Sequence, residues 1–341
     1  MVERCLRRNF DVLSVTSRLP RAVPRYLHVA KQLIQAPSDY DLVYVGFLGH
    51  PLMILGRQLT RKPMLFDAFI SVFDTLCLDR QLFRPNSVIG RLAFSLDRVS
   101  CALADVVILD TRAHARFFHR TFDVPSDKLR VLFVGCDEKL FYPRSTDSRS
   151  EESAPLVLFY GSFLPLHGVD VIIRAAKLLE ADSEIRFRLI GRGMEYDRIQ
   201  RLTRELSLEN ATFLPPVPLS QLPEEIAQAT VCLGGHFSSI GKARRVIAGK
   251  TYQCLAMGKP TIVGDNPANH ELLTPDQDAY FCPMGDPEAL ASAVLALVQD
   301  RELRNRLGSN ARQTFMERAS TPVLSEQVRE MIEEAAADGA S

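Results

Sequence analysis

The sequence predicts an α/β protein with two facing Rossmann-like domains, each built on a parallel sheet covered by helices. Short runs of aliphatic and β-branched residues alternate with helical patterns along most of the chain, as in strand–helix–strand units. The runs are almost continuously apolar, which is typical of strands buried on both faces of a parallel sheet. The alternation stops at one polar, serine-rich stretch and then resumes, which indicates two domains joined by a linker.

The serine-rich stretch sets the expected boundaries. We expect a first domain over residues 1–144, a linker over 145–154, a second domain over 155–318, and a C-terminal helix and tail over 319–341. The predicted strands of the first domain are Asp11–Thr16, Asp41–Gly46, Pro63–Asp67, Asp105–Leu109 and Arg130–Val134. Its predicted helices, in which apolar residues recur every three or four positions, are Val23–Gln35, Pro51–Leu59, Val88–Leu103 and Thr111–Phe122.

The second domain repeats the alternation. Its predicted strands are Leu156–Tyr160, Ile185–Ile190, Thr212–Leu214, Val231–Leu233 and Thr261–Val263. Its predicted helices are Val169–Leu179, Glu195–Leu206, Leu219–Ala229, Lys250–Met257 and most of the chain from Pro287 onward. Ligands of such sheets bind outside the carboxyl ends of the strands, so we expect the site in a cleft between the two domains.

Composition excludes several classes of protein. Of 341 residues, 46% are hydrophobic and 24% are charged, which is the balance of a globular chain. The 41 basic and 41 acidic residues cancel, which excludes a strongly basic nucleic-acid-binding protein, and no nucleic-acid partner is expected. The seven cysteines form no Cys-x-x-Cys pair, which argues against a disulfide framework or a zinc site and for a reducing compartment.

Charge and hydropathy also bear on where the protein works. The first ten residues are charged without an apolar segment behind them, and no run reaches the ~18 apolar residues that span a bilayer, so we expect a cytoplasmic protein. Residues 1–150 carry 22 basic and 15 acidic residues, a formal charge of +7, and the remaining residues carry −7. Peripheral contact with the anionic inner face of the cell membrane is therefore a hypothesis, and an ordinary solvated face is its alternative. The basic residues near the start are Arg4, Arg7, Arg8, Arg18, Arg21, Arg25 and Lys31.

The sharpest motif follows the first predicted strand of the second domain. The strand ends in Gly161-Ser162, and a short loop leads through His167 to Gly168, directly before a helix. Small residues let the backbone approach a ligand, and N–H groups at a helix start can bind a phosphate. A nearby anion would favour the charged form of His167. A plain strand-to-helix turn is the alternative.

A second glycine motif, Gly191-Arg192-Gly193, follows the next predicted strand. Tyr196 replaces the third glycine of a dinucleotide-binding fingerprint, and the motif lies on the second strand of its domain, so an NAD site is not indicated. A loop that offers backbone groups to a single nucleotide remains open.

A cluster of cations precedes or begins a short helix further along the chain. It consists of Lys242, Arg244, Arg245 and Lys250. The start of a helix favours negative charge. A cation is therefore expected at this position when a bound anion lies between the cation and the helix start. Lys250 is therefore a candidate anion-binding residue, with a solvated basic face as the alternative.

Taken together, three segments resemble the donor-site motifs of a known family. They are Tyr160–Gly168, Leu189–Gly193 and Lys250–Ile262. Their order and spacing are similar to those of the retaining glycosyltransferases with two Rossmann-like domains (the GT-B fold), closest to family four, the glycosyltransferase-1-like group. The resemblance covers about residues 155–300, and Val134–Pro143 also resembles the segment that closes the family's first domain.

The resemblance implies transfer of a sugar from a nucleotide-diphosphate sugar to a saccharide or lipid-linked acceptor, as in polysaccharide biosynthesis. It implies retention of configuration, no cofactor and no metal, with positive groups stabilising the leaving diphosphate in place of Mg²⁺. The residues to which it assigns catalytic roles are His167, Lys250 and Asp67. The residues to which it assigns donor binding are Gly161, Ser162, Phe163, Gly168, Gly191, Arg192, Arg245, Thr251 and Gln253.

Three departures from the family's pattern bear on activity. Arg245 stands at the first position of the Glu-x7-Glu pattern, whose second position is Gln253, and arginine cannot accept hydrogen bonds from sugar hydroxyls. The usual Arg and Lys of the first loop are missing, which leaves His167 at the Lys position. The family's first strand and its Gly-rich loop have no counterpart in the first domain. A non-catalytic partner subunit is therefore the alternative function, and a nucleotide-sugar epimerase of the same architecture is a third.

Polar residues also follow two strands of the first domain. Asp67 ends one of them and is the favoured contact for the acceptor, because the family commonly has polar residues there near the transferred sugar. Asp110 and Thr111 follow another strand and are expected to cap the next helix. Surface or packing positions are expected for three histidines, His28, His114 and His119.

Overall fold

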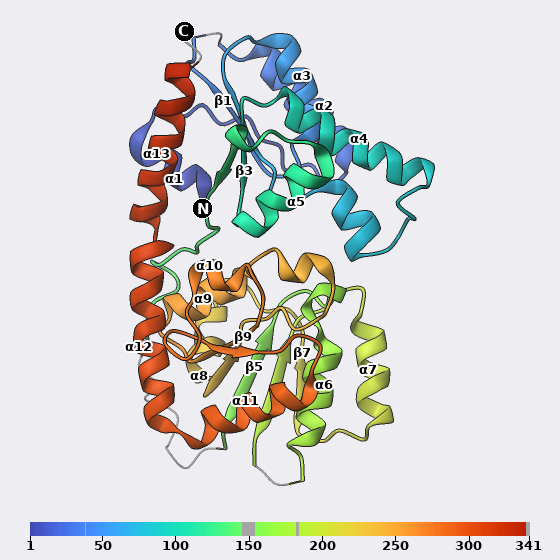
Figure 1. The fold of residues 1–341 in the computed structure, drawn as a ribbon, viewed down its shortest axis with the longest axis vertical. Coiled ribbons are helices and arrows are strands. Elements are labelled where there is room, and N and C mark those ends of the chain that lie inside the picture. The colour runs from blue at the N-terminus through green and yellow to red at the C-terminus, as the bar shows by residue number, and fades with distance from the viewer. Residues whose placement is uncertain (38, 145–153, 182–183, 339–341) are drawn as a thin grey trace. The chain divides into compact units, whose positions relative to one another are not determined.

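The structure is a computed structural model that describes residues 1–37, 39–144, 154–181 and 184–338 (Figure 1). Its internal contacts divide the chain into two units. The N-terminal unit contains residues 2–133 and the chain from 324 onward, and the C-terminal unit contains Met1 and residues 134–323. Most of the predicted linker, residues 145–153, lies outside the described residues, so the predicted domain boundaries stay a prediction.

The N-terminal unit is built on a parallel sheet with the strand order β1-β2-β3-β4. The strands are β1 (Val43–Val45), β2 (Met64–Asp67), β3 (Val106–Leu109) and β4 (Leu129–Val131). The helices are α1 (Val2–Asn9), α2 (Ala22–Gln35), α3 (His50–Leu59), α4 (Val88–Leu103) and α5 (Arg112–Phe122), with the later part of α13 (Thr321–Asp338). A π-helix, η1 (Asp74–Asp79), and a 3₁₀ turn, η2 (Ser126–Lys128), complete the unit.

The apolar runs form the sheet because their side chains are buried. Every residue of β3 is buried, and the first three residues of β2 are fully buried. One core cluster joins Phe66 of β2 and Val107 of β3 to Met53 of α3 and to Phe118 and Phe122 of α5. The predicted strands and helices from residue 23 to residue 134 are thus confirmed, with bounds that differ by a few residues.

The predicted strand Asp11–Thr16 is wrong. Residues 10–20 form neither strand nor helix, and Leu13 is 67% exposed. The Arg7 guanidinium, on α1, binds the Val12 carbonyl at 3.2 Å and the Ser14 hydroxyl at 2.7 Å. Alternating apolar residues form a strand only where a neighbouring strand pairs with them, and β1 pairs only with β2 in the described sheet.

A buried carboxylate holds the segment that follows β2. Asp97, on α4, accepts hydrogen bonds from the Ser71 hydroxyl at 2.7 Å and from the backbone N–H groups of Val72 and Phe73 at 2.9 and 2.8 Å. His50 Nε2 lies 2.9 Å from the same carboxylate. Asp97 and Ser71 are both buried, so these bonds fix the start of η1 against α4.

The C-terminal unit contains a parallel sheet with the strand order β10-β9-β8-β5-β6-β7. The strands are β5 (Leu156–Tyr160), β6 (Arg186–Ile190), β7 (Ala211–Leu214), β8 (Val231–Leu233), β9 (Thr261–Gly264) and β10 (Tyr280–Cys282). The helices are α6 (Val169–Leu178), α7 (Tyr196–Glu205), α8 (Leu222–Gln228), α9 (Gly249–Ala256), α10 (Asn269–Leu272), α11 (Pro287–Gln299) and α12 (Arg301–Arg318). Two 3₁₀ turns are η3 (Pro165–His167) and η4 (Gly241–Arg244).

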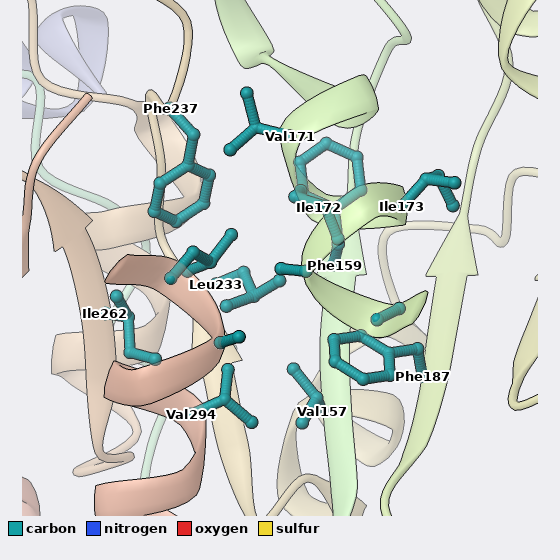
Figure 2. Packing of buried hydrophobic residues seen from close by; sticks show 14 of the residues in the cluster. Val157, Phe159, Val171, Ile172, Ile173, Phe187, Leu233, Phe237, Ile262 and Val294 are labelled. Atoms are coloured by element: carbon teal, nitrogen blue, oxygen red, sulfur yellow. The ribbon is translucent and has the colours of Figure 1, made fainter. Parts of the chain in front are cut away.

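The core of this unit lies between the sheet and helices α6 and α11. Figure 2 shows Phe159 of β5 and Phe187 of β6 packed with Ile172 of α6 and Val294 of α11. The other face of β5 meets α9, where the Tyr160 hydroxyl oxygen lies 3.3 Å from the Lys250 carbonyl oxygen. Because helices cover both faces of β5, all of its residues are buried and its sequence is a continuous apolar run, as predicted.

The sequence interpretation missed the helices α1 and α10, the π-helix η1, the edge strand β10 and the short 3₁₀ turns. All seven cysteines are buried and none is in a disulfide. Among the described helices, none is both long and apolar enough to cross a bilayer.

Asp97→Ala should destabilise the N-terminal unit by about 3–5 kcal/mol, because it leaves buried N–H and O–H donors without their acceptor. Urea unfolding monitored by circular dichroism checks this. The control is Glu334→Ala, which removes an exposed ion pair with Arg130 and should cost less than about 1 kcal/mol. Equal losses in the two variants would contradict the role given to Asp97.

Candidate functional site

The candidate site of the C-terminal unit lies at the carboxyl ends of β5, β6 and β8. A glycine follows each of these strands, at 161, 191 and 234. Parallel strands end at one edge of a sheet, so their loops lie together. Gly161 N donates to the Ile190 carbonyl at 2.9 Å, and Phe237 N donates to the His167 carbonyl at 3.2 Å. The loops therefore form one backbone-lined group.

Lys250, in the first turn of α9, reaches into these loops. Its side chain is only 7% exposed, and its Nζ lies 4.7 Å from the centre of the Phe159 ring. Within the described residues this ammonium has neither a hydrogen bond nor an ion pair. Burial lowers the pKa of Lys250 to about 8, so the group is mostly protonated at neutral pH. A buried cation is costly unless an anion approaches it.

Two histidines lie beside this lysine. The rings of His167 and His236 stack at 5.3 Å between centres, with 8° between their planes. Burial, and secondarily the charge of Lys250, hold the pKa of each histidine well below its ordinary value. Both rings are therefore neutral at pH 7 in the free protein. In each, the buried Nδ1 lacks a hydrogen-bond partner among the described residues.

Close approach within the protein requires Gly168 and Gly191, and a backbone φ of +137° accounts for Gly161. A Cβ on Gly161 would lie 3.4 Å from Lys250 Cε and 3.6 Å from His167 Cε1. A Cβ on Gly191 would lie 2.0 Å from the Gly161 carbonyl oxygen, and one on Gly168 2.5 Å from Ser238 N. Packing of loop on loop thus accounts for Gly168 and Gly191, whereas Gly161 keeps open the space beside the lysine.

Several predicted donor-binding residues have partners inside the unit. Phe163 is fully buried in the core. The Thr251 hydroxyl donates to the Gly234 carbonyl at 3.3 Å, and the Tyr160 hydroxyl donates to Gln253 Oε1 at 2.9 Å. Gln253 keeps its amide N–H groups for a ligand, and Ser162 is exposed at the loop tip.

Two predicted arginines lie on different loops of this unit. Arg245 follows η4 and is half-buried, and a Cβ on Gly241 would lie 3.0 Å from its Nη1. Arg192 holds its guanidinium over the Tyr196 ring, 4.9 Å from the ring centre. A donor contact by either arginine remains a prediction.

The N-terminal unit has its own polar cluster at the carboxyl edge of its sheet. Tyr44 donates its hydroxyl to Asp67 Oδ2 at 3.1 Å, and Phe69 N donates to Asp67 Oδ1 at 3.3 Å. Burial raises the pKa of Asp67, and the nearby Asp110 carboxylate adds to the rise, while the hydrogen bonds from Phe69 and Tyr44 oppose it. Asp67 is half-buried and therefore open to a ligand on one side.

Of the two residues predicted to cap α5, Thr111 is the N-cap, whereas the Asp110 side chain contacts the His114 ring. The Thr111 hydroxyl accepts a hydrogen bond from His114 N at 3.0 Å. His114 and Asp110 are both buried, and His114 Nδ1 lies 2.7 Å from Asp110 Oδ1. His114 is therefore a packing residue, as expected, and Asp110 holds its ring in place.

Sequence reasoning missed Tyr44, Tyr160 and His236. His236 had a signal, because Gly234-Gly235-His236 directly follows a buried strand, as Gly161 and Gly191 do. Tyr44 had none, since it lies inside β1 between two valines. Tyr160 ends β5 and begins the motif Tyr160–Gly168, but only the folded structure brings its hydroxyl to Gln253.

Comparison with proteins of known sequence finds relatives over most of the chain. A D-inositol 3-phosphate glycosyltransferase from Nocardioides sp. is 26% identical over 231 residues, which cover 61% of this chain and 49% of the relative. The chain thus matches about half of that relative's length. The enzyme of that name from Corynebacterium glutamicum is 27% identical, with 88% of this chain and 74% of the relative covered. N-acetyl-alpha-D-glucosaminyl L-malate synthase from Bacillus anthracis is 22% identical, with 93% and 73% covered.

Solved structures share the fold. Anabaena HepE in complex with UDP-glucose superimposes with a TM-score of 0.74 at 17% identity, over 97% of this chain and 88% of that one. Sucrose-phosphate synthase from Thermosynechococcus elongatus gives a TM-score of 0.73 at 20% identity, over 94% and 81%. The likeness confirms the predicted GT-B fold class.

The family itself is identified by the part of the chain that carries the glycine loops and Lys250. Residues 144–314, half of the chain, match the glycosyl transferases group 1. The match contains β5 through α11 and most of α12. The resemblance of the three motifs is therefore confirmed, and the chain belongs to the glycosyl transferases group 1.

Proposed function

We propose that the protein transfers a sugar from a nucleotide-diphosphate sugar to a saccharide or lipid-linked acceptor, with retention of configuration and without a metal ion. The observation that carries this proposal is the buried Lys250 ammonium, which has neither a hydrogen bond nor an ion pair among the described residues and lies beside two neutral histidines. A diphosphate supplies the negative charge that such a group lacks. The solved complex of the structural neighbour HepE with UDP-glucose supports the same ligand class.

The reaction requires a group that stabilises the leaving diphosphate. The bond between the anomeric carbon and the β-phosphate oxygen breaks, and negative charge develops on that oxygen. Lys250 would neutralise this charge in a site with little water, where a preformed cation is most effective. An anion also raises the pKa of neighbouring imidazoles, so His167 can become a second cationic donor once the diphosphate is bound.

The acceptor completes the exchange. Its hydroxyl oxygen bonds to the anomeric carbon on the face that the diphosphate leaves, and its proton passes to the departing β-phosphate. No protein nucleophile takes part. Asp67, a half-buried carboxylate that Tyr44 orients, is suited to accept hydrogen bonds from hydroxyls of the acceptor.

Lys250→Met should weaken binding of a nucleoside diphosphate by about 10- to 150-fold, the range for a hydrogen bond to a charged group, and leave nucleoside binding unchanged. Since HepE binds UDP in a solved complex, UDP and uridine are the first probes, followed by the other bases, in isothermal titration calorimetry. Lys259→Met is the control, because Lys259 bonds the Ala227 carbonyl, away from the glycine loops. Equal losses of UDP and uridine would remove Lys250 from the phosphate site.

The same lysine predicts a pH dependence. The free protein loses the Lys250 proton as the pH rises through about 8, so diphosphate affinity should fall above this pH by up to about tenfold per pH unit. Uridine affinity should stay flat over the same range, and in Lys250→Met the fall should disappear. A fall that persists in the variant would assign the titration to another group.

The donor sugar is predicted to carry an acidic group. Arg245 stands where the family has a carboxylate, and a guanidinium suits an anion better than a neutral hydroxyl. Transfer assays should therefore show turnover with uronic-acid donors and not with hexose donors, and Arg245→Glu should lose it. The exposed neighbour Arg244→Glu is the matched control.

Two other results are informative about the donor. Turnover of a neutral hexose that is unchanged in Arg245→Glu would mean that Arg245 lies outside the sugar pocket. No turnover with any donor, together with retained diphosphate binding, would favour the non-catalytic alternative.

Asp67→Asn should lower kcat/KM for the acceptor by about 10- to 150-fold, because an amide replaces a charged acceptor of hydrogen bonds. The KM of the donor should not change. Tyr44→Phe removes a hydrogen bond that lowers the pKa of Asp67, so the loss of activity at acidic pH should begin at a higher pH. Asp123→Asn, at an exposed position, is the control, and an effect of Asp67→Asn on the donor KM instead would contradict an acceptor role.

A further inference from the structure

The surface of the N-terminal unit carries an apolar patch. Large hydrophobic side chains between residues 82 and 99 are exposed, among them Val88 at 75% and Leu92 at 64%. We call this patch the α4 surface, and it consists of Leu82, Phe83, Val88, Ile89, Leu92 and Val99. Single exposed hydrophobic residues are ordinary, but six of them within 18 residues indicate an interaction site.

The patch follows the geometry of helix α4, which packs beside α3 (Figure 1). Val88, Leu92 and Val99 are spaced by four and seven residues, so they lie along one face of the helix. The opposite face, with Ala93 and Cys101, is buried in the core of the unit. A helix at a protein surface normally has a polar outer face, so the apolar outer face of α4 requires another explanation.

Arginines surround this apolar face. Arg80, Arg84, Arg91 and Arg98 are exposed in or beside it. Between residues 80 and 104, all of which the structure describes, the only acidic residue is Asp97, which is fully buried and bonded to Ser71, Val72 and Phe73. The exposed charge of this segment is therefore entirely positive, although Arg98 also pairs with Asp123 at 3.0 Å.

We propose that the α4 surface docks on an anionic lipid leaflet. An apolar face flanked by arginines matches the boundary between acyl chains and anionic headgroups, where side chains such as Leu82, Phe83 and Leu92 lose water and guanidinium groups meet phosphates. This inference does not depend on the transferase activity, because none of these residues belongs to the proposed donor or acceptor sites.

Charge argues against a second copy of the chain as the occupant. A symmetric dimer brings the same patch of both copies together, so the arginines of one α4 surface would face the arginines of the other. Such like-charge contact opposes association. A lipid leaflet rich in anionic headgroups offers the opposite charge.

Two of the N-terminal cations predicted from the sequence, Arg7 and Arg25, are less suited to this role. Arg7 is paired with Glu3 at 3.0 Å and bonds the Ser14 hydroxyl. Arg25 donates to the carbonyls of Leu19 and Pro20 at 2.8 and 3.3 Å. These guanidinium groups already have partners within the chain.

The chain contains no tryptophan, so a single introduced indole reports the environment of one position. Leu92→Trp in the full-length protein should shift its fluorescence to the blue with vesicles of phosphatidylcholine and phosphatidylglycerol, and not with phosphatidylcholine alone. The matched control is Leu178→Trp, at an exposed apolar position on α6, which should not shift. A shift at residue 178 equal to that at residue 92 would overturn the proposal.

Vesicle sedimentation separates the apolar and the charged contributions. Val88→Ser with Leu92→Ser should lower the partition coefficient by tenfold or more, because the leaflet would no longer bury these two aliphatic side chains. Arg84→Gln with Arg91→Gln should lower it by about 30-fold at low salt, from about 1 kcal/mol per cation, and high salt should weaken binding of the unaltered protein.

The controls for these pairs come from exposed positions of the C-terminal unit. They are Leu178→Ser with Leu219→Ser, and Arg186→Gln with Arg201→Gln. Circular dichroism checks that every variant is folded. Equal losses in test and control pairs, binding to neutral vesicles alone, or no vesicle binding would overturn the proposal. So would a dimer in light scattering that Val88→Ser with Leu92→Ser abolishes, if no vesicle binding accompanies it.

Discussion

The buried charge of Lys250 is the constraint on which the rest of the C-terminal site depends. An ammonium that is 7% exposed, with neither a hydrogen bond nor an ion pair among the described residues, opposes folding. The Phe159 ring relieves this cost only in part, because His167 and His236 beside the lysine are neutral and carry no negative charge. A buried, unneutralised cation is typical of sites where a ligand supplies the negative charge. In the proposed site, a bound diphosphate would offset this cost.

Most of the fold could be predicted because strands of a parallel sheet are buried on both faces and therefore consist of apolar residues. β5 and β3 are buried along their whole length, so every residue in them is apolar. The segment 11–16 has apolar residues at Val12, Leu13 and Val15 but no neighbouring strand, and apolar residues alone do not show whether a neighbour is present. β10 was missed for the converse reason, since it is a three-residue edge strand that is only partly buried.

The site could be predicted only in part. A glycine in the sequence indicates a close approach of the backbone, whereas a cation at a helix start indicates an anion. Glycine at 161, 168 and 191 indicated a close approach, but the sequence does not say to what. The group that approaches Gly191 is the backbone of Gly161. Only Gly161 borders the Lys250 side chain. Lys250 was predictable because a cation at a helix start is unfavourable by itself. His236 reaches His167 through the loop after β8, and only tertiary structure shows this stacking.

The net charge of zero does not show that the two units carry positive charge in different arrangements, one buried and one exposed. In the C-terminal unit the cation at the glycine loops is buried, so one lysine without water can act strongly on one ligand. On α4 the arginines are exposed and screened, so each acts weakly and only several together can favour an anionic surface. As proposed, the first arrangement would select a small ligand by its fit to fixed groups. The second would select a surface by its average charge and would tolerate lateral motion. Burial, rather than the number of charges, decides which kind of anion each unit can recognise.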